Sequence, residues 1–413
     1  MSTAVHVQFP SHHERITTRL AWLRRDSQDW TLYTMLSKST SQPGGRMKLR
    51  PRSDYPTVAL FALLLAVVWL CSGCAKPLLT CPRAVRVPVP PPPQQHSAMV
   101  LFATDRAPES QQNLSFSGEM NLSGTRMSYG AKCENPATGG TSICEEPAWL
   151  KERLPAWLEK EEFLAGIRAA NSNVVLFVHG FNISFDESLE ITLRIVQRTG
   201  VQAIPVAYSW PSQAKISAYG VDYDRNEWTI EHLKDFIQDL VNALPEGAVL
   251  HIVAHSMGNR AVLGALAHAN LPEQHLGQLV MIAPDVDSEI FKDLVVRSGP
   301  FRRKTLYVSN HDWALRAAGW LRPNDSRAGD ARKQYAVIKG MDTVDTSPLK
   351  AGRVGHSVHD YSQMMFDDLG AALKDEGPAA RKLSACTVKS IDSYNAAHGT
   401  QLPCLVYRFP AAK

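Results

Sequence analysis

The strongest candidate for chemistry is the serine within VAHSMGNRA, residues 253–261. Ser256 has small residues two positions before and after it, Ala254 and Gly258. Small residues at these places let a strand and a helix approach closely around a sharp turn, which strains the serine backbone and exposes its hydroxyl. The turn also lies at a helix N-terminus, where developing negative charge is stabilised. The pattern predicts a nucleophile; a plain helix N-cap, a common role for serine, is the alternative.

A second loop could stabilise the charge that such a serine creates. The residues HGFN, 179–182, follow the apolar run 174–178. Two backbone N–H groups aimed at the oxyanion of a tetrahedral intermediate form an oxyanion hole. We predict that Phe181 and Met257 supply these N–H groups and that Gly180 lets the backbone approach the substrate. His179 is expected to brace the loop.

A nucleophilic serine also needs a carboxylate that orients its histidine. Asp312 follows the apolar run 305–308 and is the predicted acid. Asp285 and Asp287, in APDVD after the preceding run, are the alternatives. An aspartate in such a loop is also a frequent helix N-cap.

The histidine that takes the serine proton is expected near the end of the chain. His356, in GHSVH, follows a weak apolar run at residues 335–338 and precedes the last helix-like segment. We predict that His356 is the general base and then the general acid, with His359 as the alternative. The three groups then occur in the order Ser256, Asp312, His356.

No cofactor is predicted for this chemistry. The cysteines show no C-x-x-C spacing or Cys/His cluster of the kind that binds zinc. Neither of the glycine-rich motifs that bind nucleotide phosphates occurs. We therefore expect no metal and no nucleotide cofactor.

The spacing of apolar residues indicates the scaffold that would position these loops. Runs of strand length occur at residues 98–103, 174–178, 203–207, 249–254, 278–283 and 305–308, with a weaker run at 335–338. A loop-rich stretch is expected from the end of the first run to about Pro147. Segments with helical periodicity lie at residues 184–197, 226–243, 259–269, 288–296 and 361–374. Continuous apolar strands that alternate with helices predict a doubly wound, mostly parallel α/β sheet. In such a sheet, sites form in the loops after the carboxyl ends of the strands.

Several short stretches resemble one bacterial family of α/β hydrolases, the domain of unknown function number nine hundred. They are FATDR (102–106), FVHGFN (177–182), YSWPS (208–212), YDRNE (223–227), AHSMGNR (254–260), APDVD (283–287), LYVSNHD (306–312), MDTVD (341–345) and GHS (355–357). The resemblance implies an α/β-hydrolase fold and a serine-hydrolase triad at Ser256, Asp312 and His356. It names no substrate.

The reaction expected from these groups is hydrolysis of an ester, thioester or amide through an acyl-enzyme. The partner is then an acyl-containing substrate of unknown identity. One alternative is a catalytically silent, lipid-anchored envelope scaffold that keeps the fold. Another is an acyltransferase, in which an acceptor other than water attacks the acyl-enzyme.

The N-terminal region is typical of an exported lipoprotein. Lys48, Arg50 and Arg52 precede an apolar run of 14 residues, 57–70, which suits a signal peptide better than a membrane span. The stretch LCSGC then resembles the lipobox of bacterial lipoproteins, so Cys74 is the predicted lipidation site. Residues 86–95, RVPVPPPPQQ, predict an extended tether.

We therefore divide the chain into five parts. Residues 1–46 precede the true start at Met47 or form an extension without a fold, 47–74 are the signal peptide, 75–97 the tether, 98–374 the hydrolase domain and 375–413 a C-terminal extension. The membrane is the expected partner of the lipid anchor. The predicted location is the cell envelope, facing the periplasm, and Ala75 after the lipidated cysteine favours the outer membrane.

Export agrees with the cysteines and the charge. Of seven cysteines, Cys133 and Cys144 are predicted to form one disulfide, and Cys386 and Cys404 a second, as an oxidising compartment allows. After Cys74 the chain holds 35 basic and 36 acidic residues. This near neutrality argues against nucleic acid as a partner.

Overall fold

The computed structural model describes residues 16–26, 29–38, 98–110, 114–123, 127–134, 155–312, 314–316, 326–332, 335–349, 362–385 and 406–409, and the structural statements below concern these residues. The chain forms two compact units, Met1–Pro88 and Val89–Lys413.

The first unit contains a two-stranded antiparallel sheet, β1 (Ile16–Asp26) with β2 (Asp29–Lys38). We expected no fold within residues 1–46. The reason for the difference is that both segments are rich in threonine, tryptophan, tyrosine and leucine, and β-branched and aromatic residues favour paired strands. Among the described residues, no helix is long and apolar enough to cross a membrane. Residues 47–97 lie outside the described residues, so the signal peptide and the lipidation of Cys74 stay predictions.

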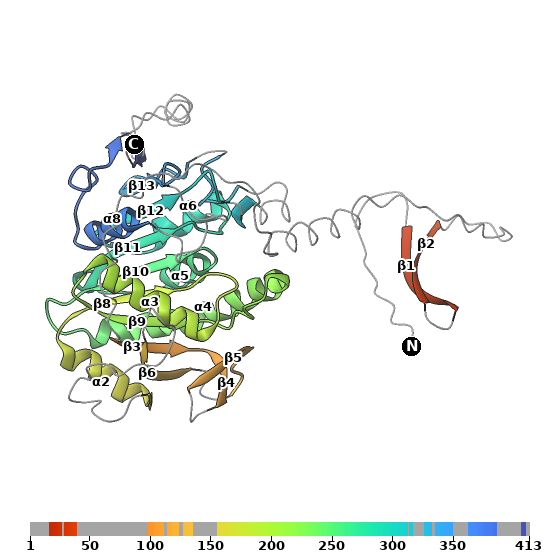
Figure 1. Ribbon diagram of the computed structural model, residues 1–413, viewed down its shortest axis with the longest axis horizontal. Helices are drawn as coiled ribbons and strands as arrows, with labels where there is room; N and C mark the ends of the chain where they lie inside the picture. Colours follow the sequence, from red (N-terminus) through yellow and green to blue (C-terminus); the bar gives the residue numbers. More distant parts are fainter. Residues whose placement is uncertain are drawn as a thin grey trace, which may run out of the picture. The chain divides into compact units, whose positions relative to one another are not determined.

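The second unit is built on an eleven-stranded sheet of order β14-β15-β13-β12-β11-β10-β8-β9-β3-β6-β7 (Figure 1). Its parallel strands are β3 (Ala98–Thr104), β8 (Asn173–Val178), β9 (Ala203–Ser209), β10 (Leu250–His255), β11 (Leu276–Ile282), β12 (Arg303–Val308), β13 (Met341–Asp345) and β15 (Val406–Arg408). The antiparallel strands lie towards the two edges: β6 (Ser128–Glu134), β7 (Ala156–Leu158) and β14 (Ser384–Ala385). A separate hairpin pairs β4 (Arg106–Ser110) with β5 (Ser115–Met120). The predicted mostly parallel α/β sheet is confirmed.

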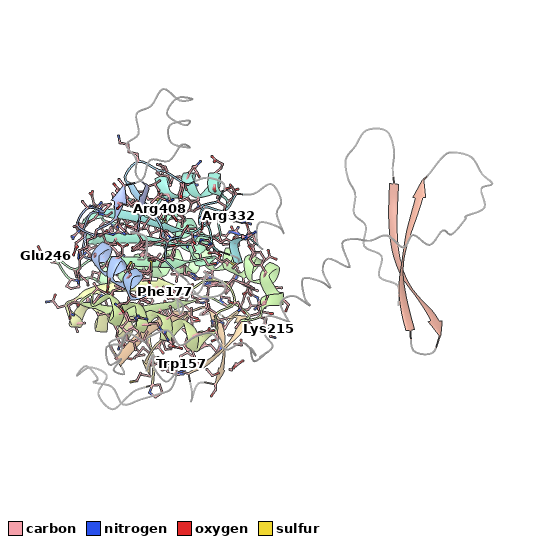
Figure 2. The ribbon with its side chains drawn as sticks, turned by 45° about the horizontal axis from the view of Figure 1, so that its top comes forward. Trp157, Phe177, Lys215, Glu246, Arg332 and Arg408 are labelled. Carbon is pink, nitrogen blue, oxygen red and sulfur yellow. The ribbon has the colours of Figure 1, made fainter. Side chains whose placement is uncertain are left out.

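Helices cover both faces of the sheet. They are α2 (Lys160–Ala170), α3 (Phe185–Thr199), α4 (Tyr219–Ala243), α5 (Gly258–His268), α6 (Ser288–Arg297) and α8 (Gln363–Leu373), with short 3-10 turns η2 (Ile216–Ala218) and η3 (Glu273–His275). Alternate residues of β8 point to opposite faces: Leu176 packs with the core under α2, α4, α5 and α6, whereas Phe177 packs with the core under α3 and α8. Figure 2 shows Phe177 inside the body and Glu246 at its margin. Burial on both faces is why the strand reads as a continuous apolar run.

One predicted strand is wrong. Residues 335–338 form no strand, and the sheet continues instead with β13, whose sequence is MDTVD. Gly340, with φ +83°, turns the chain immediately before β13. The strand is hard to recognise because it contains two buried aspartates, which are paired: Asp342 contacts Arg303 at 3.0 Å and Asp345 contacts Arg408 at 2.8 Å.

Other segments also carry more structure than the sequence indicated. The stretch expected to be loop-rich contains β4, β5 and β6, because these short strands carry many polar residues. Residues 384–385 and 406–408, placed in a C-terminal extension, pair within the same large sheet. Cys133 is buried near the end of β6, while Cys144, Cys386 and Cys404 lie outside the described residues, so both disulfides stay predictions.

Candidate functional site

Ser256 lies at the sharp turn between β10 and α5. Its φ of +52° is in the left-handed region, which is rare for a residue with a side chain and is the strained backbone that the sequence predicted. The turn is held by backbone and side-chain contacts. Ser256 N donates to Ile282 O at 2.9 Å, and Asn259 Nδ2 donates to Ser256 O at 3.1 Å and to Ile282 O at 3.1 Å. These bonds fix the serine at the carboxyl end of β10.

Gly258 explains why the turn needs a small residue after the serine. A Cβ at this position would lie 2.4 Å from His179 O and 2.6 Å from Val178 O, both backbone atoms. The start of α5 therefore packs directly on the end of β8. On the other side of the serine, Ala254 is fully buried within β10, which shows that alanine fits where the motif more often has glycine.

The loop after β8 reaches the serine. A Cβ on Gly180 would lie 2.7 Å from the Ser256 Cβ, so only glycine fits at this close approach. Within the described part of the chain, neither Phe181 N nor Met257 N donates a hydrogen bond to another residue. Met257 is buried at the N-terminus of α5, where the helix dipole favours negative charge. Two unengaged amides beside a strained serine match the donors required for an oxyanion hole.

The same loop is clamped against the end of β9. The His179 and Trp210 rings stack at 5.0 Å with an interplanar angle of 11°, and Trp210 Nε1 donates to His179 O at 2.7 Å. Burial and the nearby Arg106 hold the pKa of His179 well below its ordinary value. His179 is therefore neutral, as a bracing residue requires.

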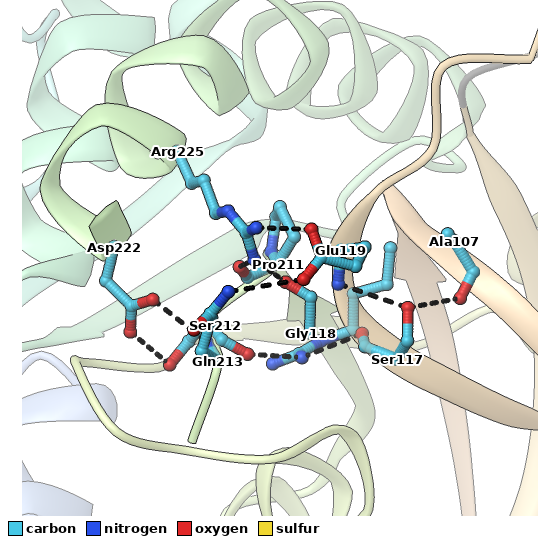
Figure 3. Close-up of polar contacts among 10 residues, drawn as sticks. Ala107, Ser117, Gly118, Glu119, Pro211, Ser212, Gln213, Asp222 and Arg225 are labelled. Carbon is cyan, nitrogen blue, oxygen red and sulfur yellow. Dashed lines mark hydrogen bonds and ion pairs between the residues drawn. The ribbon is translucent and has the colours of Figure 1, made fainter. Parts of the chain in front are cut away.

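The segment after Trp210 is itself anchored. Figure 3 shows Asp222 and Arg225 of α4 pointing at this segment. Asp222 accepts from Ser212 Oγ at 2.6 Å and from Gln213 N at 2.9 Å, and Arg225 bonds to Glu119 of β5. The segment after β9 is thus tied to α4, and α4 is tied to β5.

The three candidate acids have different surroundings. Asp312, after β12, is 1% exposed, and its Oδ1 accepts from Leu315 N at 2.9 Å. Asp287 is the N-cap of α6, accepting from Glu289 N at 2.9 Å and from Ile290 N at 3.2 Å. These two hydrogen bonds give Asp287 a structural role as a helix cap, which requires no part in catalysis.

Asp285 is committed to a buried ion pair. Its Oδ1 lies 3.2 Å from Arg327 Nε, and its Oδ2 accepts from Tyr219 Oη at 2.6 Å. Its backbone N donates to Ser256 O at 3.2 Å, so the loop after β11 touches the turn. We infer that Asp285 supports the turn.

The loops after β11 and β12 meet through a short return segment. Gly329 N donates to Pro284 O at 3.1 Å, and Ser309 N donates to Gly329 O at 3.1 Å. The loop that carries Asp312 is therefore linked through one segment to the loop that contacts Ser256. The structure brings Ser256, Phe181 and Met257 together and places Asp312 on the same edge of the sheet.

The predicted general base, His356, lies outside the residues that the structure describes. His356 and His359 are not among the described residues, so the choice between them stays a prediction. β13 is parallel to β12, which places its carboxyl end on the edge of the sheet that carries Asp312. Across the residues that the structure describes, no group of three or more His, Cys, Asp or Glu side chains could hold a metal ion.

Two residues near the site were not predicted from the sequence. Asn259 ties three backbone carbonyls of the turn together, and Arg106 is buried against the loop after β8. Both belong to the stretches AHSMGNR and FATDR that carry the family resemblance. The sequence shows that an arginine follows an apolar strand, but its contact with the loop after β8 becomes evident only when its neighbours in space are known.

A pocket of about 660 Å³ opens beside the loop after β11. Asp285, Val286 and Asp287 line one part of it, and residues of α4, α5 and α6 together with Arg327 line the rest. Ser256, Phe181 and Met257 are not among its lining residues. The pocket is therefore next to the candidate site and does not enclose the serine hydroxyl.

The model of a family described as alpha/beta hydrolase of unknown function (DUF900) matches residues 158–366. Among solved structures, the crystal structure of esterase B from Lactobacillus Rhamnosis (HN001) aligns over 70% of this chain and 88% of that chain, with 8% identity and a TM-score of 0.35. No curated protein matches the chain.

Proposed function

The chain belongs to the DUF900 family of α/β hydrolases, and from that membership we propose that it is a serine hydrolase that cleaves an ester, thioester or amide. The observation that carries the proposal is the backbone conformation of Ser256. Its φ is +52°, and the Gly180 backbone packs against its Cβ. Holding a residue with a side chain in this region costs about 1–3 kcal/mol, and such strain is concentrated at functional sites.

In the proposed reaction, Ser256 Oγ attacks the acyl carbonyl carbon while its proton passes to His356. The negative charge that develops on the carbonyl oxygen is stabilised by the N–H groups of Phe181 and Met257. The leaving group takes the proton from His356, which gives an acyl-enzyme. Water then attacks the acyl-enzyme, His356 acts as base again, and Ser256 is restored.

Asp312 is the proposed partner of the histidine. It would hold the imidazole in the tautomer whose second nitrogen can accept the serine proton, and it would stabilise the imidazolium. The contacts of the two rivals support this assignment. Asp287 caps a helix and Asp285 neutralises the buried Arg327, so each has a structural role already.

We expect a fluorophosphonate probe to label the full-length protein and to fail with Ser256→Ala. The probe phosphonylates an activated serine oxygen with loss of fluoride, and an ordinary buried serine does not provide such an oxygen. Ser298→Ala is the matched control, because Ser298 is also buried and, among the described residues, its hydroxyl donates to Val295 O of the helix that it caps, at 2.8 Å. Its labelling should equal that of the wild type.

Intact, folded wild-type protein that resists the probe would support the silent scaffold instead. Labelling that survives in Ser256→Ala would place the nucleophile elsewhere. An acyltransferase would label like a hydrolase, so added alcohol or amine should be tested as acceptor. Acyl transfer to the acceptor at the expense of the free acid identifies that alternative.

The proposal includes anchoring in the bacterial envelope through lipid on Cys74. The apolar run at residues 57–70 and the Ser72-Gly73-Cys74 stretch support it. N-terminal analysis of the mature chain tests it: a lipid-modified Cys74 is expected, and an unmodified chain beginning at Met1 or Met47 would contradict it.

A further inference from the structure

A buried guanidinium lies behind the loop that faces Ser256. Arg106 is 1% exposed, and each of its nitrogens has a partner. Nε donates to Ser209 Oγ at 2.9 Å, and Nη1 donates to Ser212 O at 2.8 Å. Nη2 donates to Ile183 O at 2.9 Å and lies 3.4 Å from His179 Nε2. Arg106 therefore links the loops after β8 and β9 at a point that solvent does not reach.

The neighbours of His179 select one of its two neutral forms. Nδ1 lies 2.8 Å from Gly180 O, which can only accept. Nε2 faces the Arg106 Nη2 donor and the Ser209 hydroxyl, both at 3.4 Å. Since Ser209 Oγ already accepts from Arg106 Nε, its own proton is available for Nε2. The contacts favour a proton on Nδ1 and a lone pair on Nε2.

The opposite tautomer has one supporting contact. Trp210 O lies 3.2 Å from Nε2 and could accept a proton from it. That arrangement would set the Nδ1 lone pair against Gly180 O at 2.8 Å and an N–H against the guanidinium. The Nδ1–H form has one repulsive contact, between the Nε2 lone pair and Trp210 O at 3.2 Å, whereas the Nε2–H form has two, one of them shorter, so the Nδ1–H form is preferred.

The bond to Gly180 O determines the direction of the next amide. A peptide unit is planar and trans, so the Gly180 carbonyl and the Phe181 N–H point to opposite sides of it. Holding the carbonyl on the His179 ring therefore holds the Phe181 N–H on the other side. The position of the absent Gly180 Cβ, 2.7 Å from Ser256 Cβ, shows how closely this loop approaches the serine.

We propose that Arg106, Ser209 and His179 form a buried hydrogen-bonded network that orients the Phe181 N–H as an oxyanion donor. His179 is the positioning residue of this network. This inference rests on the proposed serine-hydrolase function. It adds that the direction of the Phe181 N–H depends on the proton on Nδ1 of His179, a side chain that is fully buried.

Two substitutions of His179 distinguish the role of its Nδ1 from the role of its Nε2. His179→Asn can keep an N–H donor near the Nδ1 position, whereas His179→Gln moves its polar atoms to the Nε2 position and removes the donor to Gly180 O. We expect His179→Gln to lower kcat on a p-nitrophenyl ester by roughly 10²–10³-fold, the usual effect of losing an oxyanion donor, with KM almost unchanged. His179→Asn should stay within about tenfold of the wild type, since it retains the donor.

A second measurement reports on the oxyanion hole alone. A trifluoromethyl ketone forms a tetrahedral adduct with the serine, whereas the matching methyl ketone binds chiefly in its ground state. His179→Gln should weaken binding of the trifluoromethyl ketone by the same factor as kcat and leave the methyl ketone unaffected. His251→Gln is the control, because it changes a buried histidine on β10 that lies far along the strand from the turn. It should change neither kcat nor the affinity for the trifluoromethyl ketone.

If His179→Gln does not fold, Ser209→Ala carries the test. It removes the hydroxyl proton at Nε2 and the acceptor of Arg106 Nε, while Arg106 keeps its bonds to Ser212 O and Ile183 O, so kcat and trifluoromethyl ketone affinity should fall together, by about tenfold. The inference is overturned if folded variants keep wild-type kcat, or if kcat falls without a parallel loss of trifluoromethyl ketone affinity. Wild-type protein without turnover or probe labelling would instead overturn the proposed function.

Discussion

Asp312→Asn is expected to lower kcat by roughly 10⁴-fold while leaving the fold intact. The amide would hold the histidine in the wrong tautomer and would not stabilise the imidazolium, which is the source of the loss. Asparagine can still accept from Leu315 N, the bond that Asp312 Oδ1 makes at 2.9 Å, so the local turn is preserved. Steady-state kinetics on a p-nitrophenyl ester, with a thermal melt of each variant, measure both expectations.

The rival aspartates provide the controls. Asp287→Asn should keep full activity and stability, because asparagine caps a helix as well as aspartate does. Asp285→Asn should destabilise the protein by about 3–5 kcal/mol, since it breaks a buried ion pair by removing the carboxylate charge 3.2 Å from Arg327 Nε. A 10⁴-fold loss in Asp287→Asn, or near-normal kcat in Asp312→Asn, would show that the acid has been assigned to the wrong residue.

Gly258→Ala is expected to have the largest effect on stability. The added methyl carbon would lie 2.4 Å from His179 O and 2.6 Å from Val178 O, and neither backbone atom can move without shifting β8. We expect a loss of roughly 3 kcal/mol or more in the free energy of unfolding, measured by urea denaturation. Any folded fraction should have little activity, because relief of the clash displaces the loop that faces Ser256.

Gly220→Ala is the matched control for that substitution. Gly220 lies in the first turn of α4 with nothing within 4 Å of the added carbon, so alanine should be neutral or stabilise by up to about 1 kcal/mol. Wild-type stability and activity in Gly258→Ala would mean that α5 and β8 do not pack as closely as the structure shows.

The parts of the fold that sequence alone predicted are those encoded locally. The central strands are buried on both faces, so residues 174–178 of β8 appear as an uninterrupted apolar run and β10 as an apolar run that only His251 interrupts before His255. The turn at Ser256 could be predicted because the small residues that mark it, Ala254 and Gly258, lie within two positions of the serine. The loop containing Gly180 could be predicted because it directly follows such a strand.

What the sequence could not indicate depends on partners far along the chain. β13 contains Asp342 and Asp345, and these fit inside a sheet only because Arg303 and Arg408 lie beside them. The role of Arg106 depends on Ser209 and His179, more than 70 residues away. The choice between Asp312 and Asp285 as the candidate acid also depends on a distant partner. It is the ion pair between Asp285 and Arg327 that gives Asp285 a structural role.

The most direct test of the central claim is to trap the acyl group on the protein. The full-length protein is mixed with a p-nitrophenyl ester, quenched in acid during the first turnover, digested and analysed by mass spectrometry. We predict one acylated peptide, the one that contains Ser256, formed together with the first release of p-nitrophenol and absent from Ser256→Ala. Acyl groups on another residue, or turnover without any acylated peptide, would contradict the claim that Ser256 is the nucleophile.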